Sequence, residues 1–374
     1  MRSKPDTLSK SILRERIAAA LSSTPSCVSV KRWNLSLRHR SARSWGNWAG
    51  QRFFAKTFIM EPYPVTPRPT LPGEAELRRG PQLRPADVQS EHEWNMANEF
   101  RTLVGPESIP TPLGTSKVAR TNVWQEVTGF RLYELMERSL WADRQGKTLA
   151  AALGMAGGWL RRLHDASLQG REPVDIARMV EIIPTLMQKE GLHSPPYLQM
   201  ACRLLEAARR KLRSPEKLLL PVALNHGDFA LANLVWDNRK NRLFIIDFEH
   251  AGPRSVCHDL FTIIFDLRSR LLNPLIPKRV ILGAEESFWA GYGSVPGEIH
   301  ILVGALASAR IFYHSLPRLS TRRKRRGCLA GLTASLYQRF FKNIVASRRL
   351  EVADQPAVDG SQLTLDSSSS TANC

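Results

Sequence analysis

The sequence has few cysteines, and none of them form a closely spaced pair. Its five cysteines lie far apart in 374 residues, and no CxxC motif occurs. This spacing argues against both a disulfide framework and a zinc site. It is typical of a protein from a reducing compartment.

Long apolar runs are also missing. The longest apolar stretches, such as Ile299–Ala309, fall well short of the ~20 residues that a membrane-spanning helix needs. Residues 1–26 are rich in Arg, Ser and Ala and poor in acids, which is the composition of an organelle transit peptide. No apolar segment typical of a secretory signal follows them. These absences predict a soluble protein, and we expect a cytoplasmic location.

Acidic residues are scarce relative to basic ones. The chain has 53 Lys and Arg against 34 Asp and Glu, a formal net charge of +19, which excludes a neutral surface. The excess lies toward the two ends, with +10 in residues 1–60 and +11 in residues 260–349. Basic ends indicate contact with something anionic, such as phosphate, a lipid headgroup or nucleic acid. A solvated basic surface explains them equally well.

Apolar residues are nevertheless sufficient for a core, because they make up 43% of the chain, and this excludes wholesale disorder. Short β-type runs fill residues 27–60, and a stretch rich in proline and glycine follows over 62–85. Residues 91–104 have helical periodicity, and helical patterns dominate after Gly129. Residues 351–374 contain almost nothing apolar and are expected to be disordered.

The residues with the most chemical information lie in the segment 225–259, NHGDFALANLVWDNRKNRLFIIDFEHAGPRSVCHD. Asp228 follows an apolar strand, Asn233 begins the next strand, and Asp247 follows a third strand after a polar turn. Two carboxylates and a carboxamide therefore gather at strand ends on one side of a hairpin. Such a group suits Mg²⁺, which takes a few carboxylate or amide oxygens and keeps its other positions for water and phosphate. Asp228, on the loop, would remain free to orient a hydroxyl group and accept its proton.

This segment resembles the catalytic core of the aminoglycoside phosphotransferase and choline kinase families. Those families carry HGDxxxxN and, after a hairpin, an I-D-[FW]-E type of motif; residues 226–233 match the first and residues 246–249 match the second. The helix ending at 159–164 resembles the family's L-x-x-L-H helix end, and QEVTG at 125–129 resembles its hinge. The resemblance covers about residues 28–345.

The resemblance implies the bilobal protein-kinase-like fold, an α+β architecture with a small β-rich N-terminal lobe and a larger, mainly helical C-terminal lobe. A nucleotide-binding lobe and hinge are then expected over residues 27–128, and a catalytic and acceptor-binding lobe over 129–350. Residues 1–26 would be a basic and flexible arm, loose or weakly helical, and residues 351–374 a disordered tail.

The resemblance also implies roles in phosphoryl transfer from ATP. Asp228 would be the catalytic base that holds the acceptor hydroxyl in line with the γ-phosphate. His226, in the same catalytic loop, would brace that loop. Asn233 and Asp247 would hold Mg²⁺ between the phosphates.

In the N-terminal lobe, the family's nucleotide-binding lysine would be Lys56, which ends an apolar run. Its partner should be a glutamate on the following helix. Glu99 is preferred over Glu93, because Glu99 is closer to the family spacing. The hinge residues Gln125 and Val127 would bind the nucleotide.

Glu249, Asp259 and the turn at 39–44 are candidates for supporting roles around the site. Glu249 would support a second metal or a substrate group, or it is a solvated acid. Asp259 is expected to tie down the catalytic loop by hydrogen bonds. The turn at 39–44 (HRSARS) lacks the glycines of a phosphate-covering loop, and its backbone N–H groups, with Arg40 or Arg43, could still meet phosphate.

The acceptor is predicted from charge. By resemblance, aminoglycoside kinases line the acceptor cleft with acids, and choline kinases box a quaternary ammonium with aromatics and acids. Here the basic run at 322–326 would repel a cation. A neutral or anionic small-molecule or glycolipid hydroxyl acceptor is therefore favoured, and contact with nucleic acid or a membrane surface is not expected.

We therefore predict an ATP-dependent kinase that phosphorylates a hydroxyl group. Two other classes of protein stay open. One is a kinase-fold protein that binds nucleotide without transferring phosphate, and the other is a basic nucleic-acid-binding protein. The sequence does not predict the oligomeric state.

Overall fold

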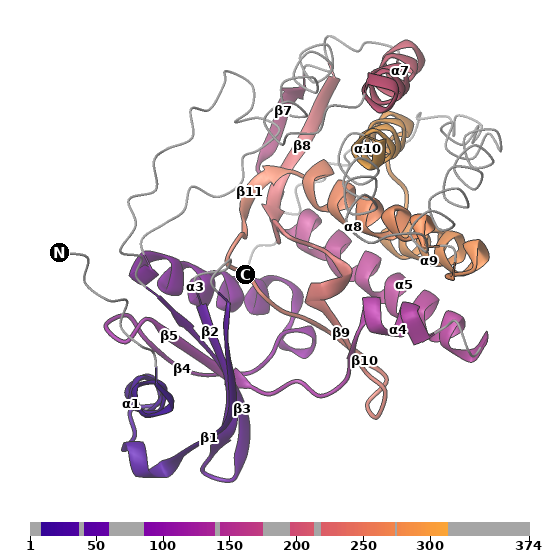
Figure 1. Ribbon diagram of the computed structural model, residues 1–374. Coiled ribbons are helices and arrows are strands. Elements are labelled where there is room, and N and C mark those ends of the chain that lie inside the picture. Colours follow the sequence, from indigo (N-terminus) through magenta and orange to yellow (C-terminus); the bar gives the residue numbers. More distant parts are fainter. Residues whose placement is uncertain are drawn as a thin grey trace, which may run out of the picture.

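The computed structural model describes residues 9–36, 41–59, 86–138, 143–174, 195–212, 218–273 and 275–312. They form a small N-terminal lobe built on a five-stranded sheet and a larger C-terminal lobe built mainly from helices (Figure 1). The predicted two-lobed α+β fold is therefore confirmed.

The N-terminal sheet is antiparallel, with strand order β1-β2-β3-β5-β4. The sequence does not predict β4, because the prolines around its start indicate only the end of a helix. Arg43 of β2 lies directly opposite Lys56 of β3, so both side chains project from the same face of the sheet. The strands are β1 (Val28–Ser36), β2 (Ser41–Trp48), β3 (Gln51–Phe58), β4 (Pro112–Ser116) and β5 (Thr121–Gln125).

A helix covers the other face of this sheet. α1 (Lys10–Ala20) contacts β1, β4 and β5, and its Leu13 and Ile17 are fully buried. Ser9 caps the helix by accepting a backbone hydrogen bond of 3.2 Å. Of the two alternatives for residues 1–26, a loose or a weakly helical arm, the helical one holds for Lys10–Ala20, but this helix is packed on the sheet and is not a flexible arm. Leu13 and Ile17 are four residues apart and so lie on one side of this basic helix, and Ala18 and Ala20 are buried with them.

Replacing Ile17 with alanine is expected to lower the free energy of unfolding by about 2–5 kcal/mol, because the change leaves a cavity between α1 and the sheet. Arg14→Ala, on the exposed side of the same helix, is the control and should cost less than about 0.5 kcal/mol. Urea denaturation measures both values. Wild-type stability for Ile17→Ala would contradict the docking of α1.

Helix α3 (Ala86–Val104) lies between the sheet and the C-terminal lobe (Figure 1). It contacts strands β3, β4 and β5 on one side and helix α5 on the other. His92 adds a hydrogen bond of 2.8 Å between its Nε2 and the carbonyl oxygen of Ala251 in the C-terminal lobe. The buried residues of α3 form one stripe: Ser90, Glu93, Met96, Ala97 and Phe100.

The C-terminal lobe is built around the helix pair α5 and α9. Two glycines allow this close packing: a Cβ at Gly157 would lie 2.2 Å from the carbonyl oxygen of Phe288, and a Cβ at Gly291 would lie 1.9 Å from that of Gly154. None of the described helices is long and apolar enough to cross a membrane. The helices are α4 (Leu132–Arg138), α5 (Asp143–Ala166), α7 (Pro195–Lys211), α8 (Cys257–Ser269), α9 (Lys278–Tyr292) and α10 (Gly297–Arg310).

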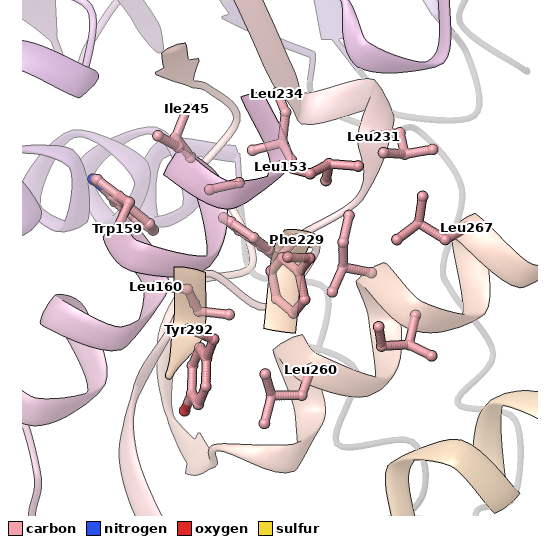
Figure 2. Packing of buried hydrophobic residues seen from close by; sticks show 14 of the residues in the cluster. Leu153, Trp159, Leu160, Phe229, Leu231, Leu234, Ile245, Leu260, Leu267 and Tyr292 are labelled. Atoms are coloured by element: carbon pink, nitrogen blue, oxygen red, sulfur yellow. The ribbon is translucent and has the colours of Figure 1, made fainter. Parts of the chain in front are cut away.

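Aromatic and aliphatic side chains from several elements fill the core of this lobe (Figure 2). Trp159 of α5 stacks on Phe229 with ring centroids 5.8 Å apart. Phe229 belongs to the loop that follows β8, so this contact anchors the loop to the core. Short 3₁₀ turns complete the chain at Pro25–Cys27, Pro106–Ser108, Leu231–Asn233 and Arg270–Leu272.

Two small antiparallel sheets carry the functional loops. One has the order β11-β8-β7 and the other β10-β9-β6, and β9 and β10 form the predicted hairpin. The short strands β6, β7 and β11 are not apparent in the sequence. The bounds are β6 (Phe130–Arg131), β7 (Gly170–Val174), β8 (Leu218–Asn225), β9 (Leu234–Asp237), β10 (Arg242–Ile245) and β11 (Gly252–Ser255).

Some sequence-based predictions concern residues outside the described ranges. They are a helix over residues 176–188, another over 326–348, the basic run at 322–326 and the tail over 351–374. These stay predictions, as do the boundaries of the domains.

Candidate active site

The loop between β8 and β9 contains a glycine that no other residue could replace without strain. Gly227 has φ +80°, in the left-handed region that favours glycine, and a Cβ there would lie 1.9 Å from the carbonyl oxygen of His250. The loop therefore runs very close to the residues that follow β10. The close contact between Gly227 and His250 places residues 226–233 beside the segment that contains Asp247.

His226 braces this loop from within. Its Nε2 is 3.0 Å from the carbonyl oxygen of Ile246, and the backbone N–H of Asp228 donates to its Nδ1 at 3.3 Å. Burial lowers the pKa of His226, so the ring is neutral at neutral pH. A neutral ring that donates through Nε2 and accepts through Nδ1 satisfies both contacts.

Asp259 at the start of α8 holds the loop from the other side. Its carboxylate accepts hydrogen bonds from the backbone N–H groups of His226 (2.6 Å) and Gly227 (2.9 Å). Burial would raise the pKa of Asp259, but His258, whose Nδ1 lies 3.8 Å from Oδ1, holds it below its usual value. Asp259 is thus an ionised anchor for the loop, the role expected from the sequence.

Asp228 and Asn233 are joined across the loop. Asn233 Nδ2 donates to the backbone oxygen of Asp228 and to its Oδ2, both at 2.9 Å. These bonds occupy the amide nitrogen of Asn233, and its carboxamide oxygen is the atom suited to a cation. The carboxylate of Asp228 is half-buried, so its position is fixed while it remains accessible.

Asp247 follows β10 in an unusual backbone conformation. It has φ +72°, which is uncommon for a residue with a side chain and typical of functional sites. Lys56 Nζ lies 2.6 Å from Oδ1, and Arg43 Nη2 lies 3.5 Å from Oδ2. Burial would raise the pKa of Asp247, but the charges of Lys56 and Arg43 hold it far below its usual value. Asp247 is therefore ionised.

Lys56 joins the two lobes through three acids. Besides Asp247, its Nζ contacts Glu93 Oε1 of α3 at 3.3 Å and Glu249 Oε2 at 2.5 Å. Burial would lower the pKa of Lys56, but Asp247, Glu93 and Glu249 together raise it. Burial also raises the pKa of Glu93 to about 7, although the charge of Lys56 opposes this shift.

The preference for Glu99 as the partner of Lys56 is wrong. Glu93 forms the ion pair and is 2% exposed, whereas Glu99 is exposed to solvent. The two positions are six residues apart and face different sides of α3. Glu93 lies in register with the buried positions Ala97 and Phe100, and this periodicity could have identified it.

Glu249 is not a solvated acid, since its side chain is 7% exposed and bound to Lys56. Arg52, another cation on β3, is 61% exposed and bonds instead to Glu126 at 2.7 Å. Only Lys56 of these two cations reaches the acids of the C-terminal lobe.

Sequence reasoning missed a row of aromatic rings on the face of the sheet that carries Lys56. Trp45 and Phe54 lie opposite each other with ring centroids 5.4 Å apart, and Phe54 stacks on Trp124 at 6.3 Å. Trp94 of α3 lies 6.2 Å beyond Trp124. Trp45 and Phe54 are half-buried and tilted by 56° to each other, and the guanidinium carbon of Arg32 lies 4.5 Å from the centroid of the Trp45 ring.

The predicted hinge residues follow or end β5. Gln125 is exposed, and its backbone N–H donates to the carbonyl oxygen of Thr111 at 2.8 Å. Val127 is half-buried in the segment that leads to β6. Their contact with nucleotide stays a prediction.

The residues around Asp247 suit a hard cation. An ionised carboxylate and a carboxamide oxygen, from Asp247 and Asn233, are donors that Mg²⁺ accepts, with water and phosphate in its remaining positions. Within the described residues, no group of three His, Cys, Asp or Glu side chains is arranged to hold a metal ion.

Gly227→Ala is expected to disrupt this site, because its Cβ would overlap the carbonyl oxygen of His250. Gly50→Ala is a matched control: Gly50 has φ +77° but nothing within 4 Å of its Cβ position. The control should cost only about 1 kcal/mol of backbone strain. Gly227→Ala should cost clearly more, as measured by thermal unfolding. Equal melting temperatures would show that the loop is not confined there.

Comparison with known proteins identifies the family. The phosphotransferase enzyme family (APH) matches residues 61–292, which is more than half of the chain. The chain therefore belongs to this family. The prediction of a phosphotransferase of the aminoglycoside phosphotransferase type is confirmed. No curated protein matches the chain.

Several solved structures are similar to this chain at low sequence identity. A microcompartment-associated aminopropanol kinase is 16% identical, with a TM-score of 0.52 over 91% of this chain and 97% of that one. The amicoumacin kinase hAmiN, solved with AMP-PNP, Ca²⁺ and Ami, is 13% identical, with a TM-score of 0.49 over 92% and 95%. A choline/ethanolamine kinase family protein from Mesorhizobium loti is also 13% identical, with a TM-score of 0.49 over 91% and 97%.

Proposed function

We propose that this protein is a kinase that transfers the γ-phosphate of ATP to a hydroxyl group of a small molecule. The observation that carries the proposal is the contact of Lys56 with Glu93 on one side and Asp247 on the other. These contacts hold the ammonium group of Lys56, which comes from the sheet, beside the ionised carboxylate of Asp247, which follows β10. A phosphate chain needs both a cation and a metal-binding carboxylate.

Asp228 is the proposed catalytic base. It takes the proton from the acceptor hydroxyl while the hydroxyl oxygen bonds to the γ-phosphorus. The bond between that phosphorus and the β–γ bridging oxygen breaks, and ADP leaves with the electron pair. The hydrogen bonds from Asn233 and the anchor at Asp259 support this role, since they fix the loop without burying the carboxylate.

Asn233 and Asp247 are the proposed ligands of magnesium. When bound, Mg²⁺ neutralises charge that develops on the phosphate oxygens. Lys56 would meet the same phosphates from the sheet, where its charge is secured by the buried acids. Asp247 would keep its carboxylate ionised for the metal throughout the neutral pH range.

The base of ATP has a matching surface. Phe54 stacks on Trp124 and is half-buried on the face of the sheet that carries Lys56, and a purine ring stacks well on such a partly open ring. We propose that the backbone at Gln125 and Val127 contacts the edge of the base.

The acceptor is proposed to be a neutral or anionic hydroxyl compound, either a small molecule or a glycolipid. The support is the net charge of +11 over residues 260–349, which disfavours a polycation.

This function is tested by measuring how fast the protein forms ADP from ATP in the presence of Mg²⁺. The assay is run first with water as the only acceptor and then with anionic, neutral and cationic hydroxyl compounds. We expect ADP formation to stop when EDTA chelates the metal. We also expect an anionic or a neutral hydroxyl compound to accelerate it. Tight ATP binding without any metal-dependent release of ADP would instead favour a nucleotide-binding protein that does not transfer phosphate.

A further inference from the structure

Two cations of the N-terminal lobe share one carboxylate. Arg43 on β2 and Lys56 on β3 are directly opposed in the antiparallel register, on the same face of the sheet. Like charges in such a pair repel each other unless an anion lies between them. Asp247 supplies that anion, with Oδ1 toward Lys56 at 2.6 Å and Oδ2 toward Arg43 at 3.5 Å.

The two contacts differ in strength. Lys56 is 2% exposed and has two further acidic partners, Glu93 and Glu249. The side chain of Arg43 is 21% exposed, and its distance of 3.5 Å to Asp247 is long for a charge-assisted hydrogen bond, which is usually 2.7–2.9 Å. Lys56 is therefore fixed, while Arg43 is loosely held at the open side of the site.

The sequence around Arg43 also favours a role for this residue in phosphate binding. The stretch HRSARS at 39–44 has no glycine, and its residues 41–44 lie in strand β2, paired with β1 and β3, instead of in the phosphate-covering turn expected from the sequence. Backbone N–H groups that take part in a sheet are poorly placed to wrap closely around phosphate. A guanidinium group binds phosphate through two parallel hydrogen bonds. Arg43 stands next to the lysine that is proposed to meet the phosphates.

We propose that Arg43 exchanges partners when ATP binds. Without nucleotide it pairs with Asp247 Oδ2; with nucleotide it moves to the phosphates and releases this oxygen for the metal. The inference rests on the proposed function, and it assigns to Arg43 both phosphate binding and control over when the metal site becomes available.

The exchange couples the two ligands. Before ATP binds, the positive charges of Arg43 and Lys56 together oppose a cation at Asp247. Once Arg43 has moved to the phosphates, its positive charge no longer offsets that of the Asp247 carboxylate, and Oδ2 is free to bind the metal. Coupling of binding free energies is reciprocal, so bound metal must strengthen ATP binding by the same factor.

Loss of Arg43 should therefore have opposite effects on the two ligands. In Arg43→Met, Mg²⁺ without nucleotide should bind at least about threefold more tightly, because one repelling charge is gone. ATP without metal should bind about tenfold more weakly, because one charge-assisted phosphate contact is lost. Adenosine should bind as to the wild type, because it has no phosphate.

Isothermal titration calorimetry with Mg²⁺ alone, with ATP in EDTA, and with adenosine measures these affinities. Arg52→Met is the matched control, since Arg52 is on the adjacent strand but contacts Glu126 and not the acid cluster. It should leave the Mg²⁺ affinity unchanged. Arg43→Lys keeps the charge and should restore the wild-type Mg²⁺ affinity, with only partial recovery of ATP affinity. Circular dichroism confirms folding, and Arg43→Gln replaces the methionine variant if that variant does not fold.

Unchanged affinity for ATP, or weaker binding of Mg²⁺ in the variant that lacks the charge, would overturn the exchange. These are binding measurements, so they give a result even when no acceptor is known. A wild-type protein that binds ATP and Mg²⁺ with this coupling but never releases ADP would contradict the proposed function and leave the exchange standing.

Discussion

Asp228→Asn is expected to lower kcat by about 10²–10⁴-fold, the usual contribution of a general base, while ATP binds with wild-type affinity. Asparagine has the same shape and keeps an oxygen that can accept the 2.9 Å hydrogen bond from Asn233 Nδ2. An amide cannot take the proton of the acceptor hydroxyl. The variant thus removes the base and preserves the loop. Single-turnover kinetics and calorimetric titration with ATP measure the two quantities separately.

Asp266→Asn is the matched control for this prediction. Asp266 Oδ2 accepts a hydrogen bond of 3.0 Å from the backbone N–H of Leu231, so it supports the same loop without being the proposed base. Asparagine can accept that bond, and kcat should stay within about threefold of the wild type. An equal loss in both variants would assign the effect to charge around the loop and contradict a base at Asp228.

The geometry of the loop between β8 and β9 could be predicted because it is local. Asp228 and Asn233 lie five residues apart and are joined by hydrogen bonds, and the β9–β10 hairpin returns the chain to Asp247. Apolar strands flank a short polar turn, and this pattern fixes the register of the hairpin. The backbone strain at Asp247, with φ +72°, is not visible in any such pattern.

The partner of Lys56 could not be identified from spacing in the same way. It depends on the rotation of α3 against β3, which is set by packing between elements distant in the sequence. The buried stripe through Glu93, Ala97 and Phe100 decides it, because Glu99 lies off that stripe. The family spacing indicates which helix carries the glutamate but not the direction in which the side chains of that helix point.

The docking of α1 was hidden for a related reason. Leu13 and Ile17 are few among many basic and small residues, so composition indicates an arm rather than a packed helix. The apolar surface on which they pack is formed by β1, β3 and β5. No local sequence pattern shows that this face of the sheet needs a helix to cover it. The aromatic row of Trp45, Phe54 and Trp124 likewise exists only once three strands are aligned.

Lys56→Met is expected to have two separate effects. Glu93, Asp247 and Glu249 would lose the cation that they share, and breaking a buried ion pair costs about 3–5 kcal/mol of stability. ATP should also bind about tenfold more weakly, because a phosphate contact is lost. Chemical denaturation measures the first effect and titration with ATP the second.

The loss of stability should depend on pH in a defined direction. Burial raises the pKa of Glu93 to about 7 in the folded protein, against an ordinary value of 4.5. The folded chain therefore binds more protons than the unfolded chain between these values, and this group's contribution to stability falls as the pH rises through them. Without Lys56 the pKa of Glu93 rises further. The deficit of Lys56→Met relative to the wild type should accordingly grow between about pH 6 and pH 8.

A second variant separates the structural role of Lys56 from its role toward ATP. Adding Glu93→Gln to Lys56→Met removes one of the uncompensated carboxylates, so part of the stability should return and the pH dependence should weaken. ATP affinity should remain low, because the phosphate contact is still missing. Arg52→Met, on the same strand but outside the acid cluster, should change neither property much. If the double variant instead recovered full ATP affinity, Lys56 would act only as the counter-charge of Glu93, and another cation would have to meet the phosphates.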